Sequence, residues 1–102
     1  MLHVIATIEL APNSREKFLA EFHRLVPEVR AEAGCIDYGP TVDFATNIPA
    51  QIPLRAEVVT IVERWESIEH LEAHLIAPHM LTYRQRVKEL VKDVKLQVLV
   101  VA

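Results

Sequence analysis

Apolar positions along this chain follow two periods, one of two residues, typical of strands, and one near 3.6 residues, typical of helices. Four segments have the strand period or the short β-branched runs that go with it: residues 2–10, 35–47, 58–65 and 94–102. The strands carry apolar side chains on both sides, which is typical of strands that are covered on both faces. The sequence therefore predicts a four-stranded sheet whose two faces are both buried.

Two helical regions separate these strands. An apolar stripe of Phe18, Phe22, Leu25 and Val29 predicts a helix over about residues 14–33. Pro27 is expected to kink this helix or to split it near Leu25. Ser67 is a favourable N-cap for the second region. Within that region Pro78 is expected to begin a further helix that runs to about Lys92.

The order of elements, β-α-β-β-α-(α)-β, is that of the ferredoxin-like split βαβ arrangement. It predicts an α+β fold, with helices on one face of a four-stranded antiparallel sheet. No helix remains for the other face, so a second copy of the chain is expected to cover it, sheet against sheet. Residues 46–57 contain two prolines and form a loop that is long enough to cover a site or an interface.

Length and composition narrow the class of protein. A chain of 102 residues with 51% apolar and 25% charged residues is expected to form one domain, residues 1–102. A net charge of −3 without a basic stripe argues against nucleic acid as a partner. No apolar run approaches the roughly 20 residues of a membrane span. The single cysteine, Cys35, cannot form an internal disulfide, which favours a cytoplasmic location.

Three stretches carry a resemblance that covers nearly the whole chain: RAEAGCIDY (30–38), VERWES (62–67) and LEAHLIAPHM (71–80). In this order and spacing they resemble the antibiotic-biosynthesis monooxygenase (ABM) family, and within it the small quinol monooxygenase-like members. The resemblance implies a homodimeric α+β barrel with a pocket between sheet and helices in each subunit. It also implies oxidation of a small phenol or hydroquinone by O2, with no metal, flavin or other cofactor.

Other members of that family leave alternatives open. Haem-degrading relatives use an Asn on the first strand, a Trp in the helix after the third strand and a His ligand further on. Here the first strand has no Asn, His74 stands at about the place of that Trp, and Arg84 stands near the place of the ligand. Haem degradation is therefore disfavoured. An isomerase of a phosphorylated sugar-like carbonyl compound and a non-catalytic ligand-binding dimer remain as alternatives.

Two histidines are the expected catalytic residues. His74 lies beside Leu71 and Leu75 on its helix, so its ring is expected to point inward, where it can deprotonate a hydroquinone as a general base. His79 can donate a hydrogen bond to a substrate oxygen. His70 and His74 lie four residues apart, but no third ligand stands at a recognised zinc spacing. No metal site is therefore expected, and His70 is expected on a solvated face.

Further residues are expected to bind the substrate. Trp65 shares a strand face with Glu63, and its indole either walls an aromatic substrate or packs in the core. Glu63 is expected either to have a raised pKa as a buried acid/base group or to form an ion pair with Arg84 or Arg86.

Aromatic residues complete the expected pocket. Tyr38 and Tyr83 can supply hydroxyl groups, and Phe22 and Phe44 are expected in the core or in the pocket lining. Cys35 is expected to be a small buried hydrophobe, not a nucleophile.

Overall fold

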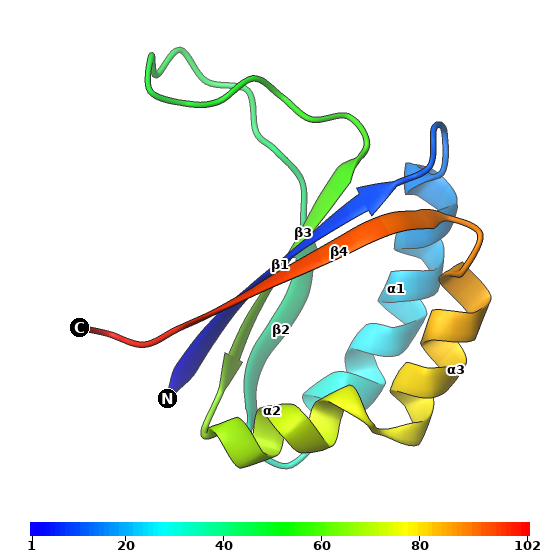
Figure 1. Cartoon of the computed structure of the whole chain (residues 1–102), viewed down its shortest axis with the longest axis vertical. Helices are drawn as coiled ribbons and strands as arrows, with labels where there is room; N and C mark the ends of the chain where they lie inside the picture. The colour runs from blue at the N-terminus through cyan, green and yellow to red at the C-terminus, as the bar shows by residue number, and fades with distance from the viewer.

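The computed structural model describes residues 1–102 and has seven elements (Figure 1). In chain order they are β1 (Leu2–Leu10), α1 (Arg15–Arg30), β2 (Cys35–Thr41), β3 (Val58–Trp65), α2 (Ile68–Leu75), α3 (Pro78–Val87) and β4 (Val91–Leu99). The strands form one antiparallel sheet in the order β2-β3-β1-β4, and the helices lie on one side of it. The predicted ferredoxin-like α+β fold is confirmed.

One face of the sheet forms the core with the helices. Alternate residues of β1, such as Val4, Ala6 and Ile8, are buried, because successive side chains of a strand point to opposite faces. Antiparallel pairing places Val4 opposite Glu63 and Ala6 opposite Ile61 of β3. The register therefore puts Glu63 and Trp65 on the helix side of the sheet, and both are buried.

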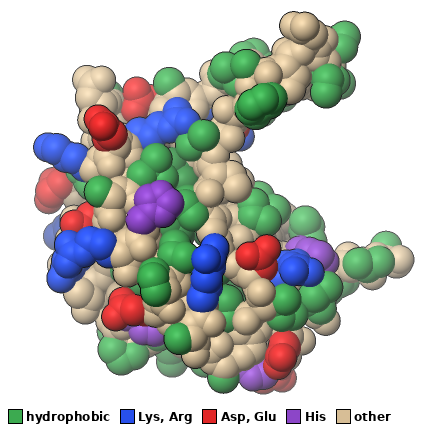
Figure 2. Space-filling view, turned by 180° about the vertical axis from the view of Figure 1, so that it is seen from behind, with side chains coloured by type: hydrophobic (Ala, Val, Ile, Leu, Met, Phe, Trp, Pro, Cys, Tyr) green, Lys and Arg blue, Asp and Glu red, His purple; other side chains and the backbone are tan.

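No element of this chain covers the other face of the sheet (Figure 1). Ile5 of β1 lies on that face opposite Val62 of β3, whose side chain is 38% exposed. Residues 42–57 extend away from the body of the domain as a long loop with exposed apolar side chains (Figure 2). No helix is long and apolar enough to cross a membrane.

The second strand is shorter than the sequence predicts. Pairing with β3 ends at Thr41 opposite Thr60, and Val42 to Asn47 leave the sheet. From Phe44 onward the register has no strand to pair with, because β3 begins only at Val58 and the residues before it belong to the same loop. The prediction that Phe44 belongs to the core or pocket lining is wrong, because its side chain is 79% exposed.

The last helix and the last strand meet earlier than predicted. Helix α3 ends at Val87 instead of about Lys92, and β4 begins at Val91. Leu90 closes a turn onto Val87 and accepts a hydrogen bond from the Ala11 amide, and Val91 pairs with Leu10. Leu90 and Val91 therefore pack against the core from a turn and from a strand, not from a longer helix.

Pro27 neither splits nor ends the first helix, which runs unbroken to Arg30. The proline stands in the last turn, with its exposed ring on the outer side. Ser14 occupies the N-cap position but makes no capping hydrogen bond, and Asn13 adopts a left-handed conformation with φ of 60°. Ser67 does cap α2, by accepting a hydrogen bond from the His70 amide.

Gly34 forms a turn that only glycine accommodates. Its φ is +81°, and an added Cβ would lie 2.2 Å from Cγ of His70. Gly34→Ala is expected to lower the free energy of unfolding by at least about 1–2 kcal/mol, the cost of a left-handed conformation alone. Gly39→Ala is the matched control, because the nearest atom to its Cβ would be 3.6 Å away. Urea unfolding of both variants tests this, and equal stabilities would contradict it.

Candidate active site

A cavity of about 400 Å³ lies between the core face of the sheet and helices α2 and α3. Twelve of its sixteen lining residues are hydrophobic, including Val94 and Leu96 of the edge strand, which are also exposed to solvent. Polar groups enter this apolar lining from Tyr38, Glu63 and His74, which are all buried. An apolar cavity with a few polar groups is typical of a binding site for a small molecule.

The cavity brings together five of the eight residues that the sequence predicts for catalysis, substrate binding or the pocket lining. These are Phe22, Tyr38, Glu63, His74 and Tyr83. Trp65 does not line the cavity: it is 0% exposed and packs behind His74, with 4.7 Å between the ring centroids. His79 lines a different, polar cleft between α1 and α3. Neither Trp65 nor His79 is therefore placed to contact a ligand in the cavity directly.

His74 stands in the last turn of α2 with its ring turned inward, as predicted, and is 1% exposed. The ring packs against Trp65 on one side and contacts Tyr38 at a centroid distance of 5.4 Å. Its Nδ1 lies 2.9 Å from Oε2 of Glu32. Burial lowers the pKa of His74, and the hydrogen bond to Glu32 opposes that shift. The resting imidazole is therefore held closer to its neutral form.

The second ring nitrogen of His74 is free of protein partners. Among side-chain polar atoms that are fully buried, only Oγ1 of Thr60 lacks a hydrogen-bond partner. Because Nε2 of His74 also lacks a partner but is not in that class, it is not fully buried. His74 lines the cavity, and its Nε2 makes no hydrogen bond within the chain. A neutral imidazole with a free Nε2 can accept a proton from a bound molecule.

Glu63 is a buried carboxyl group with one neutral partner. Its Oε1 accepts a hydrogen bond of 2.9 Å from Nε1 of Trp65. Burial is the main cause that raises its pKa to about 7. The predicted ion pair is not formed, because Arg84 donates to the Leu75 carbonyl and Arg86 lies 3.7 Å from Glu21.

The raised pKa of Glu63 predicts a pH dependence of stability. The folded chain keeps this proton up to pH about 7, whereas the unfolded chain releases it near the ordinary glutamate pKa of 4.5. The folded state therefore holds more protons between these values, and the free energy of unfolding falls by about 3 kcal/mol as pH rises through that window. Urea unfolding should show a smaller fall in Glu63→Gln, which has no such carboxyl group. An unchanged slope in that variant would contradict the assignment.

An aromatic cluster forms the wall next to α1. Phe22 stacks on Tyr38 at 5.4 Å and meets the edge of Tyr83 at 5.7 Å, between ring centroids. Burial raises the pKa of both tyrosines, so both hydroxyls stay protonated at neutral pH. Neither hydroxyl has a hydrogen-bond partner, and neither is fully buried. They can donate to oxygen atoms of a ligand.

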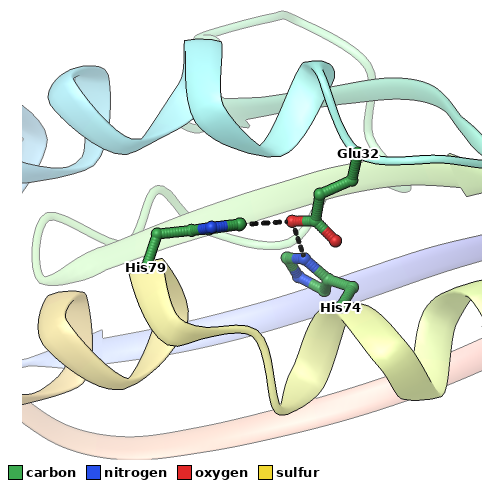
Figure 3. Close-up of side chains that lie close together, drawn as sticks. All are labelled: Glu32, His74 and His79. Atoms are coloured by element: carbon green, nitrogen blue, oxygen red, sulfur yellow. Dashed lines mark hydrogen bonds and ion pairs between the residues drawn. The ribbon is translucent and has the colours of Figure 1, made fainter.

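Sequence analysis missed Glu32, which follows the end of α1. One oxygen of its carboxylate, Oε2, lies 2.9 Å from Nδ1 of His74 and 2.6 Å from Nε2 of His79 (Figure 3). Glu32 is 42 and 47 residues away from these histidines, so no local spacing joins the three. The one signal is its place inside the stretch RAEAGCIDY, which carries part of the family resemblance.

These three residues are also the group best able to hold a metal ion. Their donor atoms all lie within 4.8 Å of one another, and two imidazoles with one carboxylate suit divalent transition metals. His70 is not part of the group, because its Nδ1 lies 2.7 Å from Oγ of Ser67 and its ring packs against Gly34. His70 is half-buried instead of fully solvated. Cys35 is also half-buried, and burial raises its pKa, so it remains a thiol at neutral pH.

Comparison with known proteins identifies the family of this chain. Residues 1–86 match the antibiotic biosynthesis monooxygenase family. The chain belongs to this family. It is 41% identical over 101 residues to the "Probable quinol monooxygenase YgiN" of Escherichia coli K12, which covers 97% of this chain and 96% of that protein. The family and this relative make the protein an enzyme of the monooxygenase type.

Solved structures place the ABM fold across the whole chain. PA3566 from Pseudomonas aeruginosa is 31% identical, with a TM-score of 0.78 over 96% of this chain and 90% of its own. Rv0793 from Mycobacterium tuberculosis is 27% identical, with a TM-score of 0.80 over 99% of this chain and 94% of its own. The sheet order and the helices on one face are therefore shared with experimentally determined relatives.

Proposed function

We propose that this ABM enzyme is a cofactor-independent monooxygenase that oxidises a small phenol or hydroquinone with O2. The proposal is carried by one observation, which is that His74, whose Nε2 has no hydrogen-bond partner in the chain, lines an apolar cavity of about 400 Å³. The name of the 41% identical relative supports a quinol as the substrate class.

The chemistry begins with removal of a proton from a substrate hydroxyl by Nε2 of His74. The resulting anion is electron-rich and can reduce O2, whereas the neutral hydroquinone reacts slowly. A hydroquinone with O2 gives a hydroxyquinone and water: one oxygen atom enters the ring, the other leaves as water, and the substrate supplies all four electrons. No external reductant is needed for this balance.

The cavity contributes orientation and exclusion of water. The hydroxyls of Tyr38 and Tyr83 can donate hydrogen bonds to the substrate oxygen that is not deprotonated. Glu63, with a pKa of about 7, can take up or return a proton within the cavity at neutral pH. The hydrophobic lining keeps bulk water from the electron-rich anion.

Oxygen uptake by the wild-type protein tests this function. A panel of hydroquinones and phenols, assayed with an oxygen electrode at pH 7.5, should include at least one substrate that consumes O2 above the uncatalysed rate. Mass spectrometry with 18O2 should find one labelled oxygen atom in the product. Absence of uptake with every member of the panel, or product without label, would overturn the proposal.

The isomerase alternative gains less support from the cavity. A phosphorylated substrate needs a cluster of cationic and backbone donors, whereas Arg84 and Lys88 are the only cations in this lining. The guanidinium of Arg84 already donates to the Leu75 carbonyl. The non-catalytic alternative expects histidines that point to solvent, whereas His74 is buried beside the cavity.

The homodimer belongs to the same proposal. Val62 lies at the centre of the uncovered sheet face, so an aspartate there is expected to leave the monomer folded and to disrupt sheet-to-sheet contact. Light scattering should give twice the 11.6 kDa chain mass for the wild type and the single mass for Val62→Asp. His23→Asp, on the exposed side of α1, is the control and should remain dimeric. A wild-type mass of 11.6 kDa would contradict the dimer.

A further inference from the structure

Two histidines share one carboxylate oxygen, and only one of them lines the cavity. Oε2 of Glu32 contacts Nδ1 of His74 and Nε2 of His79, and the three residues come from the turn after α1, from α2 and from α3 (Figure 3). An ionised carboxylate can only accept hydrogen bonds. Both imidazole nitrogens must therefore carry protons and donate to it.

This arrangement fixes the tautomer of His74. With the proton held on Nδ1 by Glu32, the lone pair of the neutral ring is on Nε2, the nitrogen available to the cavity. When Nε2 accepts a proton, the ring becomes a cation 2.9 Å from the Glu32 carboxylate. The side chains of His74 and Glu32 are 2% and 14% exposed, so solvent screens this attraction only weakly.

His79 lies outside the cavity, so it is not placed to contact a substrate bound there. Its side chain is 23% exposed, and it lines the polar cleft with Arg24, Glu28 and Arg86. Its contact with the site is the hydrogen bond to Glu32. From the start of α3, the ring thus holds the same carboxylate oxygen that His74 contacts.

We propose that Glu32 and His79 are positioning residues for His74. Glu32 holds the base in the tautomer that presents Nε2 and stabilises the imidazolium that forms, and His79 keeps the carboxylate in place. The catalytic part of this inference rests on the proposed function. The tautomer part does not, since it concerns the resting protein.

The expected size of the effect follows from similar pairs. In the Ser-His-Asp triad, replacing the carboxylate by an amide costs about 10⁴ in kcat, because the histidine takes the wrong tautomer. Partners that orient a histidine from outside the reacting group typically contribute about 10- to 100-fold. Glu32→Gln is therefore expected to lower kcat by at least about 10-fold.

Kinetics of four variants separate positioning from general stability. Glu32→Gln should lower kcat with little change in KM, and Glu32→Asp should recover part of the loss because it restores the charge. His79→Gln should lower kcat less than Glu32→Gln. Glu28→Gln is the matched control, because Glu28 lines the same cleft as His79 and has no contact with His74. Its kcat should equal that of the wild type.

The pH profile adds a readout that a merely structural role would not change. The hydrogen bond and charge of Glu32 raise the pKa of His74, so their removal lowers it. The acidic limb of kcat/KM, where the base becomes protonated, should therefore move to lower pH in Glu32→Gln. The profile of Glu28→Gln should not move.

Nitrogen NMR tests the tautomer without any assay of activity. In the wild type at pH 7.5, the His74 imidazole should carry its proton on Nδ1, and in Glu32→Gln a substantial fraction should move to Nε2. Wild-type tautomer and wild-type kcat in Glu32→Gln would overturn the inference. It would also be overturned if a chelator abolished activity and a divalent metal restored it, because the three residues would then be metal ligands. If the wild type consumes no O2, the proposed function fails, and the tautomer measurement still decides this inference.

Discussion

His74→Ala is expected to lower the rate of hydroquinone-dependent oxygen uptake by at least about 100-fold, the usual lower bound for loss of a general base. His74 is the one histidine that lines the cavity, and its Nε2 has no hydrogen-bond partner within the chain. Without it, the substrate must lose its proton to water or to Glu63. The apolar contacts that bind the substrate remain in this variant, so KM should change little and the loss of activity should appear in kcat.

Two control variants test whether the loss of activity comes from damage to the fold and not from loss of the imidazole. Alanine leaves a void between Trp65 and Tyr38, so His74→Phe, which keeps a ring there but no base, should be equally inactive. His23→Ala removes an exposed histidine of α1 and should keep wild-type activity. Thermal unfolding of each variant would show whether it is folded. A folded His74→Phe with more than a tenth of wild-type kcat would exclude His74 as the base.

Trp65→Ala is expected to have the largest effect on stability, a loss of about 3–5 kcal/mol in the free energy of unfolding. The indole is completely buried, contacts His74 and donates to Glu63, so truncation both opens a void and leaves a carboxyl group without its partner. Against a typical total of 5–15 kcal/mol, this is a large fraction. Urea unfolding at pH 7 measures it.

A second substitution separates packing from hydrogen bonding at this position. Trp65→Phe retains an aromatic ring but removes the Nε1 donor, which normally lowers the pKa of Glu63. The pKa of Glu63 should therefore rise above about 7 in this variant. Phe44→Ala, on the exposed loop, should change stability by no more than about 0.5 kcal/mol. Equal losses in Trp65→Ala and Phe44→Ala would contradict the burial of the indole.

Local patterns predicted most of the fold but misplaced its ends. The alternation in 58–65 and the cap at Ser67 indicated strand and helix at the positions where they occur. Alternation in 35–47 does not predict a strand correctly beyond Thr41, because a strand also needs a pairing partner, and that partner can be far away in the sequence. Likewise, the apolar spacing after Val87 fits a helix equally well until the pairing of Val91 with Leu10 is known.

The sequence by itself determined the order of elements, the family resemblance and the inward direction of His74, because each depends on residue types at short spacings. Only the tertiary structure decided which polar atoms meet. It joined Glu32 to two histidines more than forty residues away, directed Glu63 to Trp65 instead of an arginine, and placed Trp65 behind His74. These contacts depend on the register of the strands and the packing of helices on them, which no local pattern in one sequence records.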